Sequence, residues 1–150
     1  MAASPVPDPS LPHGKQDPLI VLAMLCWGEA RSESRQGRLA VCFVVRNRML
    51  LAPRYGTGWR GVALRAWQFS CFNPNDPNRD KSLRPLKYDS EAAWNGCYRA
   101  AKDVYEERVH DNTGGATHYH TKNIPKKPKW SSVLLRTAEI GRHVFFGMEI

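Results

Sequence analysis

The hydrophobic positions of the chain fall into segments with helical spacing, separated by polar turns. Residues 18–30 are apolar on nearly every side as far as Trp27, which predicts a helix through the middle of the core. Asp17 precedes this segment as a candidate N-cap, and Pro18 suits the first helical position. The sequence therefore predicts that the folded part begins at residue 17 with a buried helix.

A second segment, residues 35–51, has a wide apolar face and predicts another helix. Arg38, Arg46 and Arg48 are expected to remain in solvent on its polar side. Pro53 is expected to end this helix, because proline cannot continue it. The polar residues between the first two helices predict a turn.

Two more helices are expected further along the chain. A short one covers residues 59–65, and a long one covers residues 90–108, with Ser90 as its candidate cap. Between them, residues 73–88 hold three prolines among polar side chains and predict a long loop. Loops of that length in a compact domain usually border a binding site or are mobile.

The last third of the chain has less helical periodicity. Residues 116–121 alternate enough to predict a short strand, and a short helical stretch is expected after Trp130. The fold class is therefore α+β and mainly helical, with a small extended element in the second half. The length of 150 residues suits a single domain.

Residues 1–16 differ from the rest in composition. They contain four prolines and few side chains to bury, which predicts a flexible, extended and solvated tail before a folded domain of residues 17–150. Over the whole chain, 42% hydrophobic and 24% charged residues exclude wholesale disorder. No apolar run approaches the ~20 residues that a membrane-spanning helix needs.

The chain is basic, with 22 Lys and Arg against 14 Asp and Glu and a net charge of +8. Such a charge attracts a protein to polyanions without choosing between nucleic acid and an anionic cell envelope. Lys126, Lys127 and Lys129 beside Trp130 form a basic and aromatic cluster, but no known nucleic-acid-binding module surrounds it. A specific nucleic-acid partner is therefore not expected.

Glu29 is the strongest candidate for catalysis. It follows Gly28 and nine apolar residues, at the point where a buried helix reaches the surface. Apolar surroundings raise the pKa of a carboxyl group, so that it holds a proton at neutral pH and can deliver it to a leaving oxygen. On spacing alone, a glutamate that merely turns into solvent at a helix end is the simpler alternative.

Other kinds of site have weaker support. His118, His120 and His143 could supply three metal ligands, but no H-E-x-x-H helix accompanies them, and neither a metal nor a cofactor is expected. Asp76 and Asp111 are candidates for a second carboxylate, although loop aspartates usually form turns. No nucleophile elbow or phosphate-binding glycine loop is present. The cysteines include no C-x-x-C pair and are expected to be reduced: Cys26, Cys42, Cys71 and Cys97.

Several motifs match one family in the right order. The matching blocks are Trp27-Gly28-Glu29-Ala30-Arg31-Ser32-Glu33-Ser34, Gly37, Ala40-Val41, Val45-Arg46-Asn47-Arg48, Gln68-Phe69-Ser70, Asp111-Asn112-Thr113-Gly114-Gly115-Ala116-Thr117-His118-Tyr119-His120 and Ile140-Gly141-x-His143-x-Phe145-Phe146. Over residues 19–146 the sequence thereby resembles the SleB-type cell-wall hydrolases, which include spore-cortex-lytic enzymes. Ser32 and Arg38 depart from the pattern, where glycine and glutamine are usual.

The resemblance implies a lysozyme-like, lytic-transglycosylase-like fold and an enzyme that cleaves peptidoglycan between N-acetylmuramic acid and N-acetylglucosamine. Glu29 corresponds to the single essential glutamate of the family, which implies that it protonates the glycosidic oxygen and then acts as base. Attack by the 6-hydroxyl of muramic acid gives a 1,6-anhydro product, whereas a hydrolytic muramidase uses water and a second carboxylate. The alternative from another class is a non-catalytic basic module that binds wall or nucleic acid.

Polar and aromatic side chains on otherwise apolar segments are expected to hold the sugars: Gln68, Ser70, Tyr119, His120 and Trp67. Phe69 is expected to pack in the core instead. Glu33 is expected to pair with an arginine, such as Arg31 or Arg46, and to organise the turn between the first two helices.

The place of action is also an expectation at this point. The start of the chain lacks a signal-peptide pattern, which favours a bacteriophage endolysin released from the host cytoplasm by a holin, or a virion-associated hydrolase. The protein is expected to act as a monomer on peptidoglycan, with its charge attracting it to the anionic cell envelope.

Overall fold

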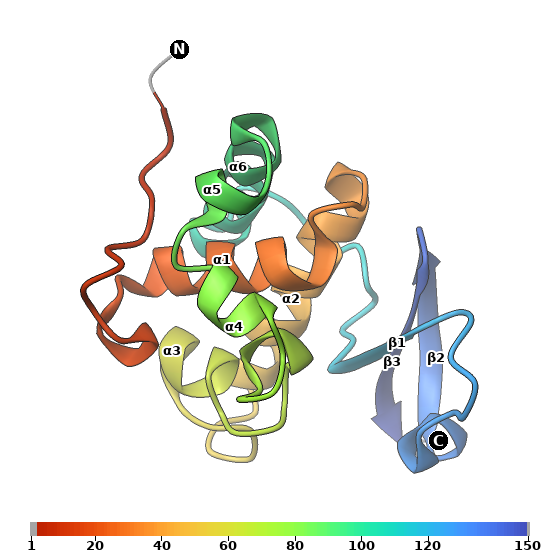
Figure 1. Ribbon diagram of the computed structural model, residues 1–150. Helices are drawn as coiled ribbons and strands as arrows, with labels where there is room; N and C mark the ends of the chain where they lie inside the picture. Colours follow the sequence, from red (N-terminus) through yellow and green to blue (C-terminus); the bar gives the residue numbers. More distant parts are fainter. Residues whose placement is uncertain (1–2, 150) are drawn as a thin grey trace.

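A helical body and a small antiparallel sheet lie side by side in the computed structural model, which describes residues 3–149 (Figure 1). The helices are α1 (Pro18–Ala30), α2 (Arg35–Met49), α3 (Gly58–Ala63), α4 (Asn78–Lys81), α5 (Pro85–Tyr88) and α6 (Glu91–Tyr105). The strands are β1 (His118–Thr121), β2 (Leu134–Ile140) and β3 (His143–Glu149), and single 3-10 turns are η1 (His13–Lys15), η2 (Ser70–Phe72) and η3 (Lys129–Ser132). The predicted fold class is confirmed.

Helix α1 passes through the middle of the helical body, where α2, α3 and α6 pack against it (Figure 1). Every side chain from Ile20 to Trp27 is buried. Asp17 caps the helix, because its Oδ1 accepts a hydrogen bond from the backbone N–H of Leu19 at 2.9 Å. The predicted helix is confirmed, and its last turn carries Glu29 from the core to the surface.

The other long helices also form where their periodicity predicts them. Helix α6 is capped by Ser90, whose hydroxyl accepts a hydrogen bond from the N–H of Ala93 at 3.1 Å. Helix α2 ends at Met49, two residues before the predicted boundary. The expectation that Arg48 stays in solvent is wrong: its side chain is buried, because it lies three residues after Val45 on the apolar face of the helix.

Two predicted irregular or helical segments fold differently. Residues 73–88 contain two single-turn helices, α4 and α5, which pack against η2 and α6 respectively rather than forming an open loop. The stretch after Trp130 has only one 3-10 turn before β2, so the helix expected there is wrong. Strand β2 forms because its backbone pairs with β3 across a turn at Gly141, which has a φ of 57°.

The sheet has the strand order β1-β3-β2, with both pairs antiparallel. This places β3 in the centre and confirms the predicted extended segment as β1. Tyr119 of β1 lies opposite Phe145 of β3, and Phe145 is fully buried in the core. Directly opposed residues share a face of the sheet, so Tyr119 faces the helical body.

The segment before α1 is anchored to the helical body and is not a solvated tail along its length. The indole N–H of Trp94 donates to the carbonyl oxygen of Pro5 at 2.8 Å, and His13 Nε2 lies 2.7 Å from the carbonyl oxygen of Arg79. Gln16 is buried and donates to the carbonyl oxygen of Asp8 at 2.6 Å. The ends of the expected tail and domain, residues 1–2 and 150, lie outside the described residues.

Two remaining expectations concern cysteines and membrane helices. All four cysteines are free and buried. In the part of the chain that the structure describes, none of the helices combines the length and the apolar character needed to cross a bilayer.

Candidate active site

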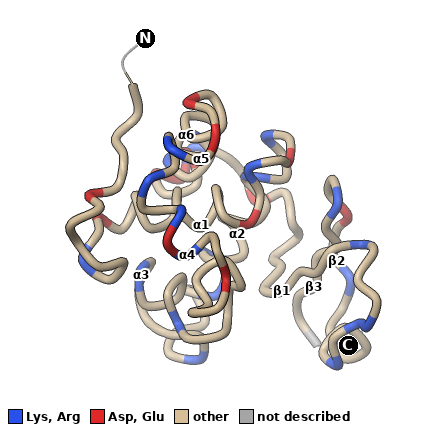
Figure 2. Tube along the Cα trace, viewed as in Figure 1, with Lys and Arg blue, Asp and Glu red and all other residues tan. Residues whose placement is uncertain are grey.

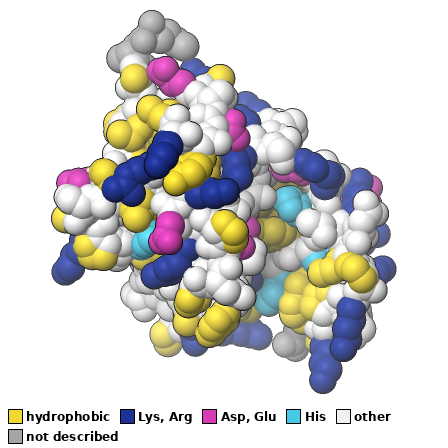
Figure 3. Space-filling view, viewed as in Figure 1, with side chains coloured by type: hydrophobic (Ala, Val, Ile, Leu, Met, Phe, Trp, Pro, Cys, Tyr) yellow, Lys and Arg dark blue, Asp and Glu magenta, His cyan; other side chains and the backbone are white. Residues whose placement is uncertain are grey.

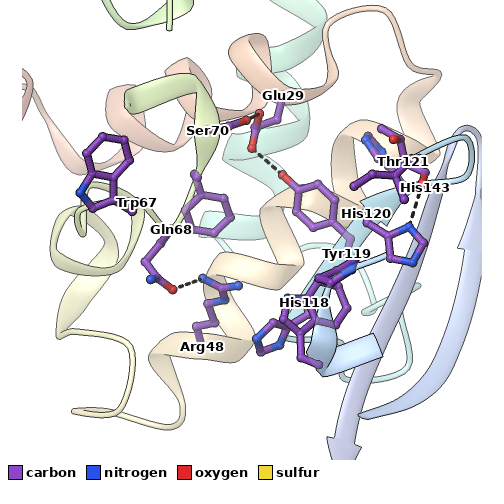
Figure 4. Close-up of a pocket in the computed structure, with 14 residues that line it drawn as sticks. Glu29, Arg48, Trp67, Gln68, Ser70, His118, Tyr119, His120, Thr121 and His143 are labelled. Atoms are coloured by element: carbon purple, nitrogen blue, oxygen red, sulfur yellow. Dashed lines mark hydrogen bonds between the residues drawn. The ribbon is translucent and has the colours of Figure 1, made fainter. Parts of the chain in front are cut away.

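A groove of about 560 Å³ runs between the helical body and β1, and histidine side chains gather in this hollow (Figures 3 and 4). It is lined by Glu29, Arg48, Trp67, Gln68, Phe69, Ser70, His118, Tyr119, His120, Thr121, Ile124, Pro128, Trp130 and His143. A second hollow of about 310 Å³ has Glu29, Glu33 and Arg142 in its wall. Glu29 lines both hollows and therefore lies between them.

The carboxyl group of Glu29 is held by two hydroxyl groups from distant parts of the chain (Figure 4). The phenol of Tyr119 donates a hydrogen bond to Oε1 at 2.8 Å, and the hydroxyl of Ser70 donates to Oε2 at 3.2 Å. Tyr119 comes from β1, whereas Ser70 begins η2. The structure thus brings together three residues that were predicted as site residues.

The environment raises the pKa of Glu29. Burial is the largest cause, and the hydrogen bonds from Tyr119 and Ser70 oppose it. The negative charge of Asp76 adds to the upward shift. A carboxyl group in this state retains its proton to higher pH than an ordinary glutamic acid, as a general acid requires.

Gly28 allows η2 to approach α1 closely enough to place Ser70 beside Glu29. A Cβ atom on Gly28 would lie 2.5 Å from Cβ of Cys71, the residue after Ser70. Contacts below 3.0 Å do not occur between real Cβ atoms, so any side chain here has to displace the buried turn. The glycine next to the candidate acid therefore has a packing role.

Gly28→Ala is expected to destabilise the fold by about 1–3 kcal/mol, because the added methyl group overpacks α1 against η2. Shifting Ser70 should also lower the rate of the cell-wall cleavage that the family resemblance implies. Urea unfolding measures the first effect and a turbidity assay on purified walls the second. Gly61→Ala is the matched control, since a Cβ there meets no atom within 4 Å; equal stability of both variants would contradict the packing role.

Trp67 and Gln68 form one wall of the groove (Figure 4). Trp67 is 66% exposed, and its backbone has a φ of 63°, a strained value for a residue with a side chain of this size. Gln68 Oε1 accepts a hydrogen bond from Nη1 of Arg48 at 3.2 Å. Phe69 is 2% exposed, which confirms the expectation that it packs in the core.

The histidines of the groove contact aromatic rings and backbone. The ring of His118 lies 4.8 Å from that of Trp130, and the ring of His143 lies 5.0 Å edge-on to Tyr119. His120 Nδ1 is 2.8 Å from the carbonyl oxygen of Thr121. Among residues 3–149, no group of three or more metal-ligating side chains is arranged to hold an ion.

The two candidates for a second carboxylate occupy different environments. Asp111 accepts four hydrogen bonds, three from Thr113 and Gly115 within its own turn and one from Asn47. These bonds outweigh its burial and hold the pKa of Asp111 below its usual range, and it lines neither hollow beside Glu29. Asp76 accepts a hydrogen bond from the N–H of Asn78 and lies close enough for its charge to act on Glu29.

Glu33 pairs with an arginine, as expected, but the partner is Arg142 in the turn of the β2–β3 hairpin and not Arg31 or Arg46. Its Oε1 accepts from the N–H of Arg142 at 2.8 Å, and its Oε2 from the guanidinium at 3.0 Å. Burial alone would raise the pKa of Glu33, but these bonds outweigh it and hold the pKa below its usual range. Glu33 lies in the turn between α1 and α2, and its bonds to Arg142 join this turn to the turn of the β2–β3 hairpin.

Several groove residues were not predicted from the sequence as site residues. Arg48 was assigned to the solvent, Trp130 only to a basic cluster, and the remaining lining residues Thr121, Ile124 and Pro128 to no site. The spacing of Arg48 after Val45 is the one sequence signal that places it on an inward face.

The groove of this mainly helical domain is lined by one carboxyl group among the described residues, that of Glu29, and burial raises its pKa. The chain belongs to the cell wall hydrolase family, whose profile matches residues 32–146, and the predicted kind of enzyme is confirmed at this level. Glu29 lies three residues before that range, so its assignment rests on the geometry of the site.

Two solved structures share the fold. One is the catalytic domain of the germination-specific lytic transglycosylase SleB from Bacillus anthracis, with a TM-score of 0.66 and 22% identity over 87% of this chain and 93% of that one. The other is the catalytic domain of the Bacillus cereus SleB protein, with a TM-score of 0.62 and 22% identity over 87% and 89% of the two chains. No curated protein sequence matches the chain.

Proposed function

We propose that this protein cleaves the glycan strands of peptidoglycan between N-acetylmuramic acid and N-acetylglucosamine by lytic transglycosylation. The observation that carries the proposal is the position of Glu29, between two hollows and held by Tyr119 and Ser70. Membership of the cell wall hydrolase family and a fold shared with a lytic transglycosylase support it.

Glu29 acts first as acid and then as base. Its carboxyl proton moves to the glycosidic oxygen as the bond to C1 of muramic acid breaks, and the N-acetylglucosamine end leaves as an alcohol. The carboxylate then takes the proton of the muramic acid 6-hydroxyl while that oxygen bonds to C1. The tethered hydroxyl needs no separate positioning, which favours its attack over that of water.

The remaining groove residues hold the strand. Trp67 offers an exposed aromatic face to a pyranose ring, and Gln68 and His120 offer polar atoms to hydroxyl and acetamido groups. Lys and Arg positions lie along the helical body and along the segment between β1 and β2 (Figure 2). Their positive charge attracts the protein to the anionic wall.

Digestion of purified peptidoglycan is expected to release 1,6-anhydromuramyl products. These are ~18 mass units lighter than products of hydrolysis, because no water is added to the cleaved bond. Mass spectrometry of the soluble fragments distinguishes the two. If reducing-end muramic acid is the dominant product, the protein cleaves the glycan strand by hydrolysis, and the transglycosylation part of the proposal is overturned.

A hydrolytic muramidase is the second candidate, and the observation that favours it is the negative charge of Asp76, which acts on Glu29 and raises its pKa. Asp76 itself lines neither hollow beside Glu29. In that reaction Asp76 would activate a water molecule or stabilise the cation. Asp76→Asn then abolishes activity, whereas under transglycosylation it changes the rate modestly through the pKa of Glu29. Asp80→Asn, an exposed neighbour in α4, is the matched control.

The rate of cleavage is expected to fall as pH rises through the pKa of Glu29. The acid has to carry its proton, and burial raises its pKa above the ordinary glutamate value of ~4.3. The alkaline limb of the kcat/KM profile should therefore lie above that value. An alkaline limb at the pKa of an ordinary glutamate would show that the folded protein does not raise the pKa of Glu29.

A further inference from the structure

Arg48 holds a positive charge at the wall of the groove in a fixed position (Figure 4). The residue is 5% exposed, and its guanidinium lies 4.9 Å from the ring centre of Tyr55 and 4.8 Å from that of Phe69. Nε donates to the carbonyl oxygen of Thr117 at 2.6 Å, and Nη1 donates to Gln68 Oε1. These contacts leave little freedom for the guanidinium to move.

Every described partner of Arg48 is neutral. Within residues 3–149, the ion pairs do not include Arg48, and its Nη2 has no hydrogen-bond partner. Burial lowers the pKa of the guanidinium, but arginine remains protonated at neutral pH. A buried charge without a counter-ion is unfavourable, so an anion entering the groove would gain from meeting it.

The same end of the groove carries further positive charge. A hollow of about 390 Å³ shares Gln68, His118 and Trp130 with the main groove and includes the exposed Arg65 in its lining. No acidic side chain is among its described lining residues. Burial and the charges of Arg48 and Arg54 lower the pKa of His118 to about 4, so at neutral pH the arginines supply the charge.

We propose that Arg48 and Arg65 bind a carboxylate carried by the substrate at this end of the groove. The inference rests on the proposed function, because muramic acid is the sugar of the glycan strand that carries an acid. That acid is the lactyl carboxylate where no peptide is attached, or a carboxylate of the attached peptide where one is. Guanidinium groups bind carboxylates through charge-assisted hydrogen bonds, and the unpaired Nη2 of Arg48 can donate one.

This site sets the register of the strand relative to Glu29. Arg48 and Glu29 line the same groove, with Tyr119 contacting Glu29 and contributing to the electrostatic environment of Arg48. An acidic sugar held by the arginines therefore occupies a defined position along the groove. A neutral polymer of N-acetylglucosamine has no group to hold there, so the site also favours peptidoglycan over chitin-like strands.

The test measures binding rather than cleavage. The probe is the disaccharide of N-acetylglucosamine and N-acetylmuramic acid with a free lactyl carboxylate, compared with its neutral methyl ester by NMR titration at low salt. We expect the acid to bind at least about tenfold tighter than the ester, as for one hydrogen bond between charged groups. A second pair, the muramyl dipeptide form with free and with amidated carboxylates, separates a lactyl from a peptide source.

Arg48→Gln and Arg65→Gln should each reduce the preference for the acid, and Arg48→Lys should retain part of it. Arg65 is exposed, so its variant tests the site even where a change at the buried Arg48 impairs folding. Arg99→Gln, an exposed arginine of α6, changes the net charge equally and should keep the preference. An unchanged preference in both test variants would overturn the inference.

The two proposals fail in different ways. Equal binding of acid and ester by the native protein would leave Arg48 as a structural contact between α2 and the segment before β1, without affecting the proposed reaction. Failure of the native protein to cleave walls would overturn the proposed function, while a measured preference for the acid would still establish the carboxylate site.

Discussion

Glu29→Gln is expected to reduce peptidoglycan cleavage by at least about a hundredfold, the typical contribution of a positioned general acid. Glutamine retains the shape and can still accept hydrogen bonds from Tyr119 or Ser70 through its carbonyl oxygen. It has no proton to transfer to the glycosidic oxygen and forms no carboxylate to act as base. The release of soluble fragments from radiolabelled walls is sensitive enough to measure a hundredfold loss of cleavage.

The same variant is expected to be at least as stable as the native protein at neutral pH. A folded-state pKa raised above the unfolded value means that the stability contributed by protonated Glu29 is present at low pH and is lost as pH rises. Glutamine is neutral throughout. The difference in Tm between the variant and the native protein should therefore grow in favour of the variant as pH rises.

Glu91→Gln is the matched control, because Glu91 is exposed in the first turn of α6 and undergoes the same chemical change. It should leave activity within about twofold of native, as surface substitutions usually have small effects. A Glu29→Gln protein that retains a tenth of the native rate would show that another group supplies the proton.

The sequence predicts Glu29 as the candidate acid because the signal that singles it out is local. A buried apolar run ends at Trp27, and Glu29 follows it after Gly28, where the helix reaches the surface. Periodicity and capping likewise predict α1, α2 and α6, where the apolar face and the cap belong to the same segment. Such features need no information from distant residues.

Features that depend on distant partners are not predicted. The partner of Glu33 is Arg142, 109 residues away along the chain. The sequence around Glu33 gives no reason to choose Arg142 over Arg31 or Arg46 as that partner. Strand β2 has little alternation of its own and forms through pairing with β3. Residues 3–16 are anchored by side chains such as Trp94, which belongs to α6.

The family resemblance supplies a role for Glu29, but for the rest of the site it supplies residue types without their contacts. It includes Tyr119 and Ser70 in separate motifs, and only the fold reveals that both donate to Glu29. The expectation of a bacteriophage endolysin stays a prediction, since neither the fold nor the site bears on the origin of the chain.

Tyr119→Phe is expected to lower kcat/KM by roughly ten- to a hundredfold. The phenol donates to Glu29 Oε1 at 2.8 Å, and this bond strengthens as Glu29 loses its proton and becomes a carboxylate in the transition state. A hydrogen bond to a charged group contributes about 1.5–3 kcal/mol, which corresponds to that range of rates. The aromatic ring and its contact with Phe145 remain in the variant.

The pH profile separates this role from a loss of packing. Because the bond from Tyr119 lowers the pKa of Glu29, its removal should raise that pKa and move the alkaline limb of the profile to higher pH. Tyr98→Phe, which removes a hydroxyl from a partly buried tyrosine of α6, should change neither the rate nor the limb. A slower Tyr119→Phe enzyme with an unmoved limb would mean that the hydroxyl acts on the substrate rather than on Glu29.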